Sequence, residues 1–131
     1  MENKLIYEEL TYKIRGCLYK VHNELGRLCN EKQYGDALEG ELKKEGIQHK
    51  REKILDKCFD VEKFGRNRVD FIVEDKIILE LKTSNCLSKN DYFQCQRYLT
   101  SSGLRLALLV NFRSKRVVIK RVLNTKMYKN K

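Results

Sequence analysis

Two acidic residues and one lysine lie within a pair of apolar, β-rich segments in the middle of the chain. Asp70 is part of RVDFIV, and Glu80 and Lys82 are part of IILELKT. Because side chains alternate between the two faces of a strand, Asp70 shares a face with Ile72, and Glu80 shares a face with Lys82. An unpaired charge in a central strand is costly to bury, so these groups need a compensating partner.

The residue types leave two kinds of partner open. Two carboxylates, a carbonyl oxygen and water form a site for a hard cation. A Mg²⁺ ion held there could activate water and stabilise the charge that develops on a phosphodiester. Alternatively, Glu80 and Lys82 form a salt bridge on a strand that faces solvent. The E-x-K pattern with one acid upstream does not by itself decide between the two.

Three helices are predicted from apolar residues at helical spacing and from the residues that end each segment. Gly26 is a stop signal for the first helix, Asn30 can cap the second, and Ser88, followed by an acid three residues later, can cap the third. The predicted helices span residues 1–26, 30–45 and 88–101.

Five strands are predicted where the pattern changes to alternation or to a continuous apolar run. They span residues 57–63, 68–73, 76–83, 104–112 and 116–122, with a short acidic turn between the second and third. The run LRLALLVNF in the fourth predicts burial on both faces. The order ααβββαββ predicts an α/β fold in which helices pack against one sheet.

Size and charge indicate one domain with a polyanionic partner. The 131 residues, 1–131, suffice for one domain, and no linker or repeat divides them before a Lys-rich basic tail at residues 123–131. Lys and Arg number 28 and Asp and Glu number 18, a formal net charge of +10. Such a balance favours nucleic acid as the partner, although a solvated basic surface without a partner is the alternative.

Location and redox state follow from the termini and the cysteines. No apolar run reaches the roughly 18 residues of a membrane span, and acidic residues near the start are not typical of a signal peptide. We therefore expect a cytoplasmic protein that does not bind membranes. The five cysteines include no C-x-x-C pair, which favours free thiols over disulfides or a zinc site; they are Cys17, Cys29, Cys58, Cys86 and Cys95.

Several separated segments resemble one known family. VHNELGRLCNEKQYGDALEGELKKEGI, RVDFIVEDKIILELKT, QCQRYL and LRLALLVNF occur in the order and spacing of the PD-(D/E)XK nuclease superfamily, and within it of the small GxxExxY proteins. The similarity extends from about Arg15 to Val122. It implies a restriction-endonuclease-like αβββαβ core with a mixed central sheet flanked by helices. The first glycine of the G-x-x-E-x-x-Y signature is replaced by Leu28, although Glu31 and Tyr34 are present.

The resemblance assigns catalytic and metal-binding roles. Asp70 and Glu80 match the acidic positions that bind Mg²⁺ or Mn²⁺, and the backbone carbonyl of Leu81 would be a third ligand. Lys82 matches the lysine that orients the attacking water or stabilises the transition state. Glu31 matches the helix glutamate that holds a second metal or its water. For Glu31 the alternative is an acid that stabilises the first turn of a helix.

The resemblance to the RecB/Cas4-like branch concerns residues on the predicted third helix. Gln94 and Tyr98 match a Q-x-x-x-Y element that lies beside the DNA, and His22 falls where this branch often carries a histidine able to approach the metal. The alternatives are a helix-neighbour hydrogen bond for Gln94, packing for Tyr34 and Tyr98, and a satisfied helix histidine for His22. No cysteine follows Cys95, so we expect no iron–sulfur cluster.

Basic residues around these segments are candidates for phosphate contacts. They flank the predicted strand of Asp70 or lie on the helix of Gln94. The predicted DNA-binding set is completed by Arg66, Arg68, Lys89 and Arg97.

Two functions of different classes follow. The first is a Mg²⁺- or Mn²⁺-dependent deoxyribonuclease that cleaves phosphodiester bonds with metal-activated water. The second is a non-catalytic DNA-binding or partner-binding module that retains the nuclease fold. Both are compatible with a homodimer or with a subunit of a larger DNA-processing system.

Overall fold

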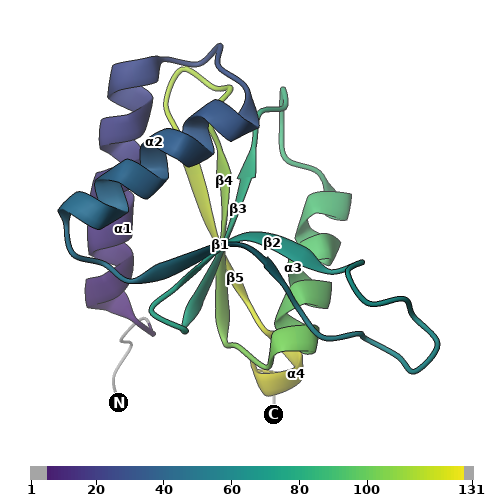
Figure 1. The fold of residues 1–131 in the computed structure, drawn as a ribbon. Coiled ribbons are helices and arrows are strands. Elements are labelled where there is room, and N and C mark those ends of the chain that lie inside the picture. The colour runs from purple at the N-terminus through teal and green to yellow at the C-terminus, as the bar shows by residue number, and fades with distance from the viewer. Residues whose placement is uncertain (1–5, 129–131) are drawn as a thin grey trace.

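A mixed sheet with helices on both faces organises the computed structural model, which describes residues 6–128 (Figure 1). The strands lie in the spatial order β1-β2-β3-β4-β5; the β3–β4 pair is parallel and the other pairs are antiparallel. The elements are α1 (Glu8–Leu25), α2 (Glu31–Lys44), β1 (His49–Ile54), β2 (Arg68–Val73), β3 (Ile77–Lys82), α3 (Lys89–Ser102), β4 (Leu106–Asn111), β5 (Val118–Leu123) and α4 (Thr125–Tyr128).

Alternation along β2 and β3 decides which side chains meet which helices. Phe71 and Leu79 pack in the core beneath α1 and α2, whereas Ile72 and Ile78 pack beneath α3. The whole of β4 is buried, as its apolar run predicts, because helices cover both faces of the sheet. Glu80, two residues after Ile78 on β3, therefore lies on the face that α3 covers.

The predicted caps fix where α2 and α3 begin. The side chain of Asn30 accepts a hydrogen bond from the backbone N–H of Gln33, and the side-chain oxygen of Gln33 accepts one from the backbone N–H of Asn30. Ser88 and Asp91 form the same reciprocal pair at the start of α3. Asn30 thereby makes Glu31 the first residue of α2.

Tyr34 closes the turn between α1 and α2. Its hydroxyl donates to the carbonyl of Gly26 at 2.5 Å and accepts from the N–H of Cys29 at 3.3 Å. Its ring is fully buried and stacks on Phe112, with the ring centroids 4.2 Å apart. These contacts bear out the packing interpretation of Tyr34, because they satisfy its hydroxyl within the turn.

The strand predicted at residues 57–63 is wrong, because those residues form turns in the long loop between β1 and β2. The strand that pairs with β2 is HKREKI, which lacks the apolar alternation that marks a half-buried strand. Instead, the Arg51 guanidinium and the His49 ring cover the Phe71 ring, with the guanidinium carbon 5.6 Å and the imidazole centroid 5.9 Å from its centroid. The flat guanidinium and imidazole groups of two polar residues thus cover Phe71 where apolar side chains would be expected.

The basic tail predicted at 123–131 is wrong for its first part. Leu123 ends β5, and the amide of Asn124 donates to the carbonyls of Leu99 and Leu104, which ties the chain to the end of α3. Residues 125–128 form α4. The rest of the tail, 129–131, and residues 1–5 of the predicted first helix lie outside the described residues.

Two further sequence predictions concern the cysteines and the membrane. All five cysteines are free thiols, as expected from their number and spacing. Within residues 6–128, none of the helices has the length and apolar character that a bilayer crossing requires.

Candidate active site

The ladder between β2 and β3 ends where Asp70 and Glu80 face each other. Backbone pairing runs from Val73–Ile77 to Phe71–Leu79 and then stops. Beyond this point β2 continues beside β1, and β3 continues beside β4 as far as Lys82. Figure 1 shows the two strands pointing away from each other beyond the split. The sheet is therefore open at the position of the two acids.

The two carboxylates bridge the open strands. Glu80 Oε2 accepts the backbone N–H of Asp70 at 3.0 Å, and Asp70 Oδ2 accepts the backbone N–H of Leu81 at 2.7 Å. Each acid thus replaces a carbonyl that an unbroken ladder would supply. The other oxygens, Asp70 Oδ1 and Glu80 Oε1, have no hydrogen-bond partner among the described residues and remain free for a ligand.

Burial makes both acids difficult to ionise. Glu80 is 4% exposed, and burial together with the charge of Asp70 raises its pKa to about 8. Burial and the charge of Glu31 raise the pKa of Asp70, although the N–H of Leu81 opposes this effect. Two acids that repel each other in a dry site are typical of a position where a cation binds.

Lys82 is held on the α3 side of the split. Its ammonium donates to Gln94 Oε1 at 2.9 Å and lies 3.7 Å from Asp91 Oδ1. Gln94 was expected beside DNA, which stays a prediction; in the structure its side-chain oxygen accepts from Lys82. Asp91 was predicted only as a capping residue. The capping pattern explains one carboxylate oxygen and does not indicate that the other one faces Lys82. Tyr98 lies on the same helix, where burial and the charge of Glu80 raise its pKa to about 12.

A cavity of about 220 Å³ opens on the α2 side of the split. It brings together Glu31, Asp70 and Leu81, which come from α2, β2 and β3. Glu80 and Lys82 do not line it, because they lie behind Asp70 toward α3. The full lining is Glu31, Lys32, Gly35, Arg51, Glu52, Arg68, Asp70, Phe71 and Leu81.

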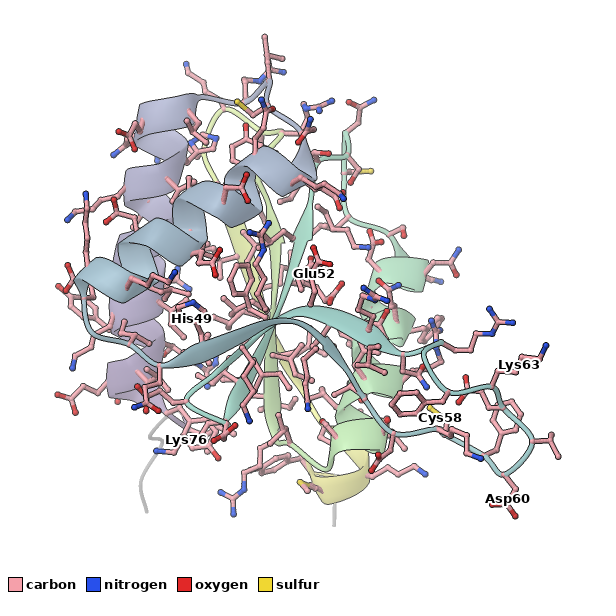
Figure 2. All side chains as sticks on the ribbon, in the orientation of Figure 1. His49, Glu52, Cys58, Asp60, Lys63 and Lys76 are labelled. Atoms are coloured by element: carbon pink, nitrogen blue, oxygen red, sulfur yellow. The ribbon has the colours of Figure 1, made fainter. Side chains whose placement is uncertain are left out.

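Glu52 is a site residue that the sequence analysis missed. It lies in β1 between Arg51 and Lys53, which pair with Phe71 and Val69 of β2. It lines the cavity and has a φ of 52°, which is unusual for a residue with a side chain. Its Oε1 lies 3.5 Å from Arg68 Nη1, and Figure 2 shows it near the centre of the sheet. No motif points to it; only the register of β1 against β2 reveals it, and the predicted strand lay elsewhere.

Arg51 connects β1 to the helix that carries Glu31. Its guanidinium binds Asp36 Oδ1 at 2.7 Å and Glu39 Oε1 at 3.1 Å, and it passes directly over Gly35. A Cβ atom on residue 35 would collide with this guanidinium. Gly35 therefore lets the Arg51 guanidinium lie directly against α2.

Gly35→Ala is expected to lower the free energy of unfolding by about 1–3 kcal/mol, because Arg51 must leave Asp36 and Glu39. Denaturant unfolding measures the change. Gly40→Ala on the same helix is the matched control, since nothing lies within 4 Å of the added Cβ. The control should gain up to about 1 kcal/mol from helix propensity. A Gly35→Ala variant as stable as the Gly40→Ala variant would contradict the proposed contact.

The remaining predicted residues lie outside the cavity. His22 Nε2 lies 3.1 Å and 3.0 Å from the carbonyl oxygens of Phe112 and Ser114, so this nitrogen is a donor in a buried contact and is not directed at the acids. Three exposed basic residues form no ion pair among residues 6–128: Arg66, Lys89 and Arg97. Of the predicted phosphate-binding set, only Arg68 lines the cavity.

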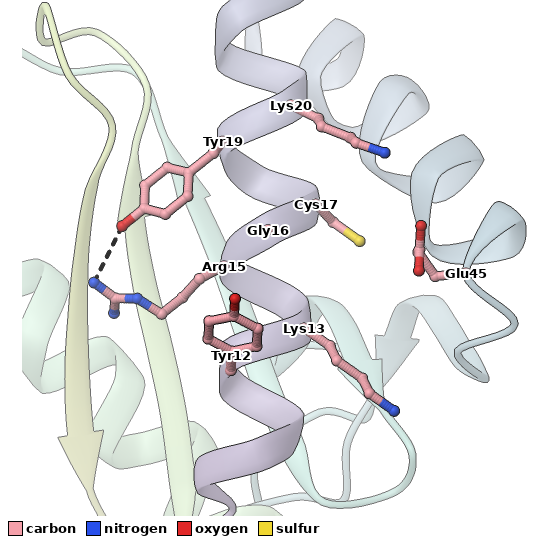
Figure 3. Close-up of a pocket in the computed structure, with 8 residues that line it drawn as sticks. All are labelled: Tyr12, Lys13, Arg15, Gly16, Cys17, Tyr19, Lys20 and Glu45. Atoms are coloured by element: carbon pink, nitrogen blue, oxygen red, sulfur yellow. Dashed lines mark hydrogen bonds between the residues drawn. The ribbon is translucent and has the colours of Figure 1, made fainter.

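A larger hollow, of about 530 Å³, lies on α1 over Gly16 (Figure 3). Tyr12 and Tyr19 stand on either side of Gly16, and Arg15 Nη2 lies 3.3 Å from the hydroxyl of Tyr19. The hollow contains none of the residues predicted to do chemistry. The split between β2 and β3 is therefore the better candidate for catalysis.

The donor set at the split fits a magnesium ion. Within the described part of the chain, no three His, Cys, Asp or Glu side chains converge closely enough to hold a metal by themselves. Mg²⁺ does not need such a cage, because it keeps several waters and binds through one or two carboxylates and substrate phosphate. Asp70 and Glu80 supply two carboxylates with one free oxygen each, which fits this requirement.

Comparisons with known proteins agree with this architecture. A family model described as the PD-(D/E)XK nuclease superfamily matches residues 8–122. The crystal structure of an alkaline exonuclease from Laribacter hongkongensis is similar with a TM-score of 0.52 and 12% identity, over 97% of this chain and 74% of that chain. At this identity the similarity shows the fold alone. No curated protein matches the sequence. Because the family model spans nearly all of the helices and strands described above, the chain belongs to the PD-(D/E)XK nuclease superfamily.

Proposed function

We propose that the chain is a metal-dependent nuclease that hydrolyses DNA phosphodiester bonds at the split between β2 and β3. The observation that carries this proposal is the pair of buried carboxylates, Asp70 and Glu80, held across open strands with Lys82 beside them. A nuclease needs cation-binding acids and a fixed positive group at one place, and the split supplies both.

Mg²⁺ or Mn²⁺ would be held by Asp70, Glu80 and the backbone carbonyl of Leu81. A bound ion would supply a water molecule of lowered pKa and stabilise negative charge on the phosphate. Glu31 lines the same cavity as Asp70 and would orient water or a second ion. The raised pKa values of Asp70 and Glu80 support this assignment, because a cation relieves the repulsion between them.

Lys82 would act on the water or on the transition state. Its long side chain is restrained by Gln94 and Asp91, so the ammonium does not have to be ordered when substrate binds. Gln94 is a positioning residue in this scheme, and Tyr98 packs in the buried cluster beneath α3.

DNA is the proposed substrate because of charge and placement. The chain has a net charge of +10, and Arg68 lines the cavity beside Asp70. Exposed basic residues continue from it along the loop and α3 and would contact neighbouring phosphates; they are Arg66, Lys89 and Arg97. Within the superfamily, the Q-x-x-x-Y element and the Glu31–Tyr34 spacing support a GxxExxY protein of the RecB/Cas4-like branch.

The experiment that tests this function compares Lys82→Ala with the parent in cleavage of single-stranded, duplex and branched DNA with Mg²⁺ or Mn²⁺. We expect cleavage by the parent that is abolished by EDTA. Loss of one group that stabilises the transition state lowers the rate by about a hundredfold or more.

Lys13→Ala is the control, since this exposed lysine of α1 lines the separate hollow of Figure 3 and does not line the cavity at the split. Equal rates for the parent and Lys82→Ala would contradict the assigned role of the lysine. DNA binding that is unaffected by metal, with no cleavage of any substrate, would favour the non-catalytic binding module.

A further inference from the structure

We propose that the loop between β1 and β2 binds unpaired bases of the nucleic acid next to the active site, with Phe59 and Phe64 as stacking surfaces. The proposal rests on the proposed function, because the site supplies the nucleic acid. It adds a preference for substrates that have a single-stranded segment at this position. We call residues 57–66 the aromatic loop.

Large apolar side chains of the aromatic loop face solvent. Phe59 is 58% exposed, Val61 is 87% exposed and Phe64 is 68% exposed. The loop therefore gains little free energy of folding from them, whereas the apolar residues Val69, Phe71 and Val73 of the neighbouring strand β2 are fully buried. Apolar residues concentrated on one exposed segment mark a binding surface.

The aromatic loop is held in one shape by its own hydrogen bonds. At its base, the N–H of Leu55 donates to the carbonyl of Asn67 at 2.7 Å. Glu62 Oε1 accepts from the N–H of Cys58 at 2.6 Å and from the side-chain amide of Asn67 at 3.0 Å. Ser101 on α3 donates to the carbonyl of Asp56 at 2.5 Å. The rings are thus presented without the cost of ordering a mobile segment on binding.

The aromatic loop continues directly from the site. Its two ends join β1, which carries Glu52, and β2, which begins with Arg68 and carries Asp70. Figure 2 shows Cys58, Asp60 and Lys63 projecting well beyond the sheet. The chain from Phe64 to Asp70 spans at most about 20 Å, so a strand held at Asp70 reaches the loop within a few nucleotides.

The charge of the loop favours base stacking over phosphate binding. The aromatic loop together with the preceding Asp56 carries no net charge, because Lys57, Lys63 and Arg66 are balanced by three acids; the acids are Asp56, Asp60 and Glu62. Phosphate binding would need an excess of positive charge, whereas base stacking on an aromatic ring does not. The net charge of +10 on the whole chain favours nucleic acid over a protein or a second copy as the partner.

The test compares the Phe59→Ala/Phe64→Ala double variant with the parent in binding of a fluorescent oligodeoxythymidylate and of a blunt duplex, both in EDTA to prevent cleavage. We expect at least about a tenfold loss of affinity for the single strand and an unchanged affinity for the duplex. The dependence of affinity on salt should be the same for both proteins, because no charge is removed. Phe59→Trp/Phe64→Trp should retain binding.

Val61→Ser is the matched control, since it removes an exposed apolar side chain of the same loop without an aromatic ring. Equal single-strand affinity in the double variant and parent would overturn the proposal, as would a parent that binds neither probe. A change of oligomeric state in the double variant would also overturn it and indicate a protein interface. Cleavage with Mg²⁺ is scored separately: a parent that binds the single strand through the rings but cleaves nothing refutes the proposed function and not the loop.

Discussion

Asp70→Asn is expected to weaken Mg²⁺ binding by about a hundredfold or more while the protein remains folded. The amide oxygen of Asn can still accept the N–H of Leu81, which Asp70 Oδ2 accepts at 2.7 Å. What the substitution removes is the negative charge, and a hard cation depends on charged oxygen ligands. Calorimetric titration of Mg²⁺ measures the loss without requiring that the correct substrate be known.

Two variants separate charge from structure in this experiment. Asp70→Ala also removes the acceptor for the N–H of Leu81, so it should lose stability as well as metal binding. Asp75→Asn removes an exposed acid in the turn between β2 and β3 and should leave Mg²⁺ binding unchanged. If Asp70→Asn bound Mg²⁺ as the parent does, the acids would be structural and the non-catalytic module would be the better description.

Glu80→Gln is expected to stabilise the metal-free protein at alkaline pH, a result opposite to that of most core substitutions. The folded state raises the pKa of Glu80 from 4.5 to about 8. A raised folded pKa means that the stability contributed by the protonated acid is complete below pH 4.5 and is lost as the pH rises toward 8. Each pH unit in this window costs at most about 1.4 kcal/mol, so the penalty at its upper end is large beside the stability of a domain.

Thermal unfolding across this pH range measures the effect. In EDTA, the Tm of the parent should fall between pH 4.5 and 8, and the Tm of Glu80→Gln should fall much less. The difference should reach roughly 10 °C at the alkaline end. Added Mg²⁺ should raise the Tm of the parent there and not that of the variant. Glu24→Gln, at an exposed acid of α1, is the control; parallel curves for the parent and Glu80→Gln would contradict the burial of this charge.

The central strands could be predicted from sequence because the spacing of their apolar residues follows directly from their burial. RVDFIV and IILELKT alternate or run apolar since helices cover both faces, and the turn between them is short enough to set their register. The strand HKREKI has no such apolar pattern, because it lies at the edge of the sheet and covers Phe71 with Arg51 and His49. Residues 57–63 of the aromatic loop were wrongly predicted as a strand, because apolar residues alternate there although they are exposed.

The candidate site was predictable where its residues are close in sequence or belong to a family motif. Asp70, Glu80 and Lys82 follow from two adjacent strands. The places of Glu52 and Arg51 could not be predicted, because both residues belong to a strand that the sequence did not indicate. They depend on how this strand pairs with β2 and on the contact of Arg51 with Gly35 of α2, and no local pattern encodes either. Asp91 was recognised for one of its oxygens only. The register between strands that are far apart in the chain cannot be predicted from such local patterns.

The hydrogen bonds that join Asp70 and Glu80 to the opposite strand restrict how this site can decay during evolution. A lineage that no longer needed catalysis would be free to lose the charges but not the oxygens, because each oxygen completes a backbone contact across the split. Asn at position 70 and Gln at position 80 preserve those contacts, whereas apolar residues abandon them. Inactive descendants should therefore pass through amides first, and paired amides at these two positions would be the mark of a former nuclease.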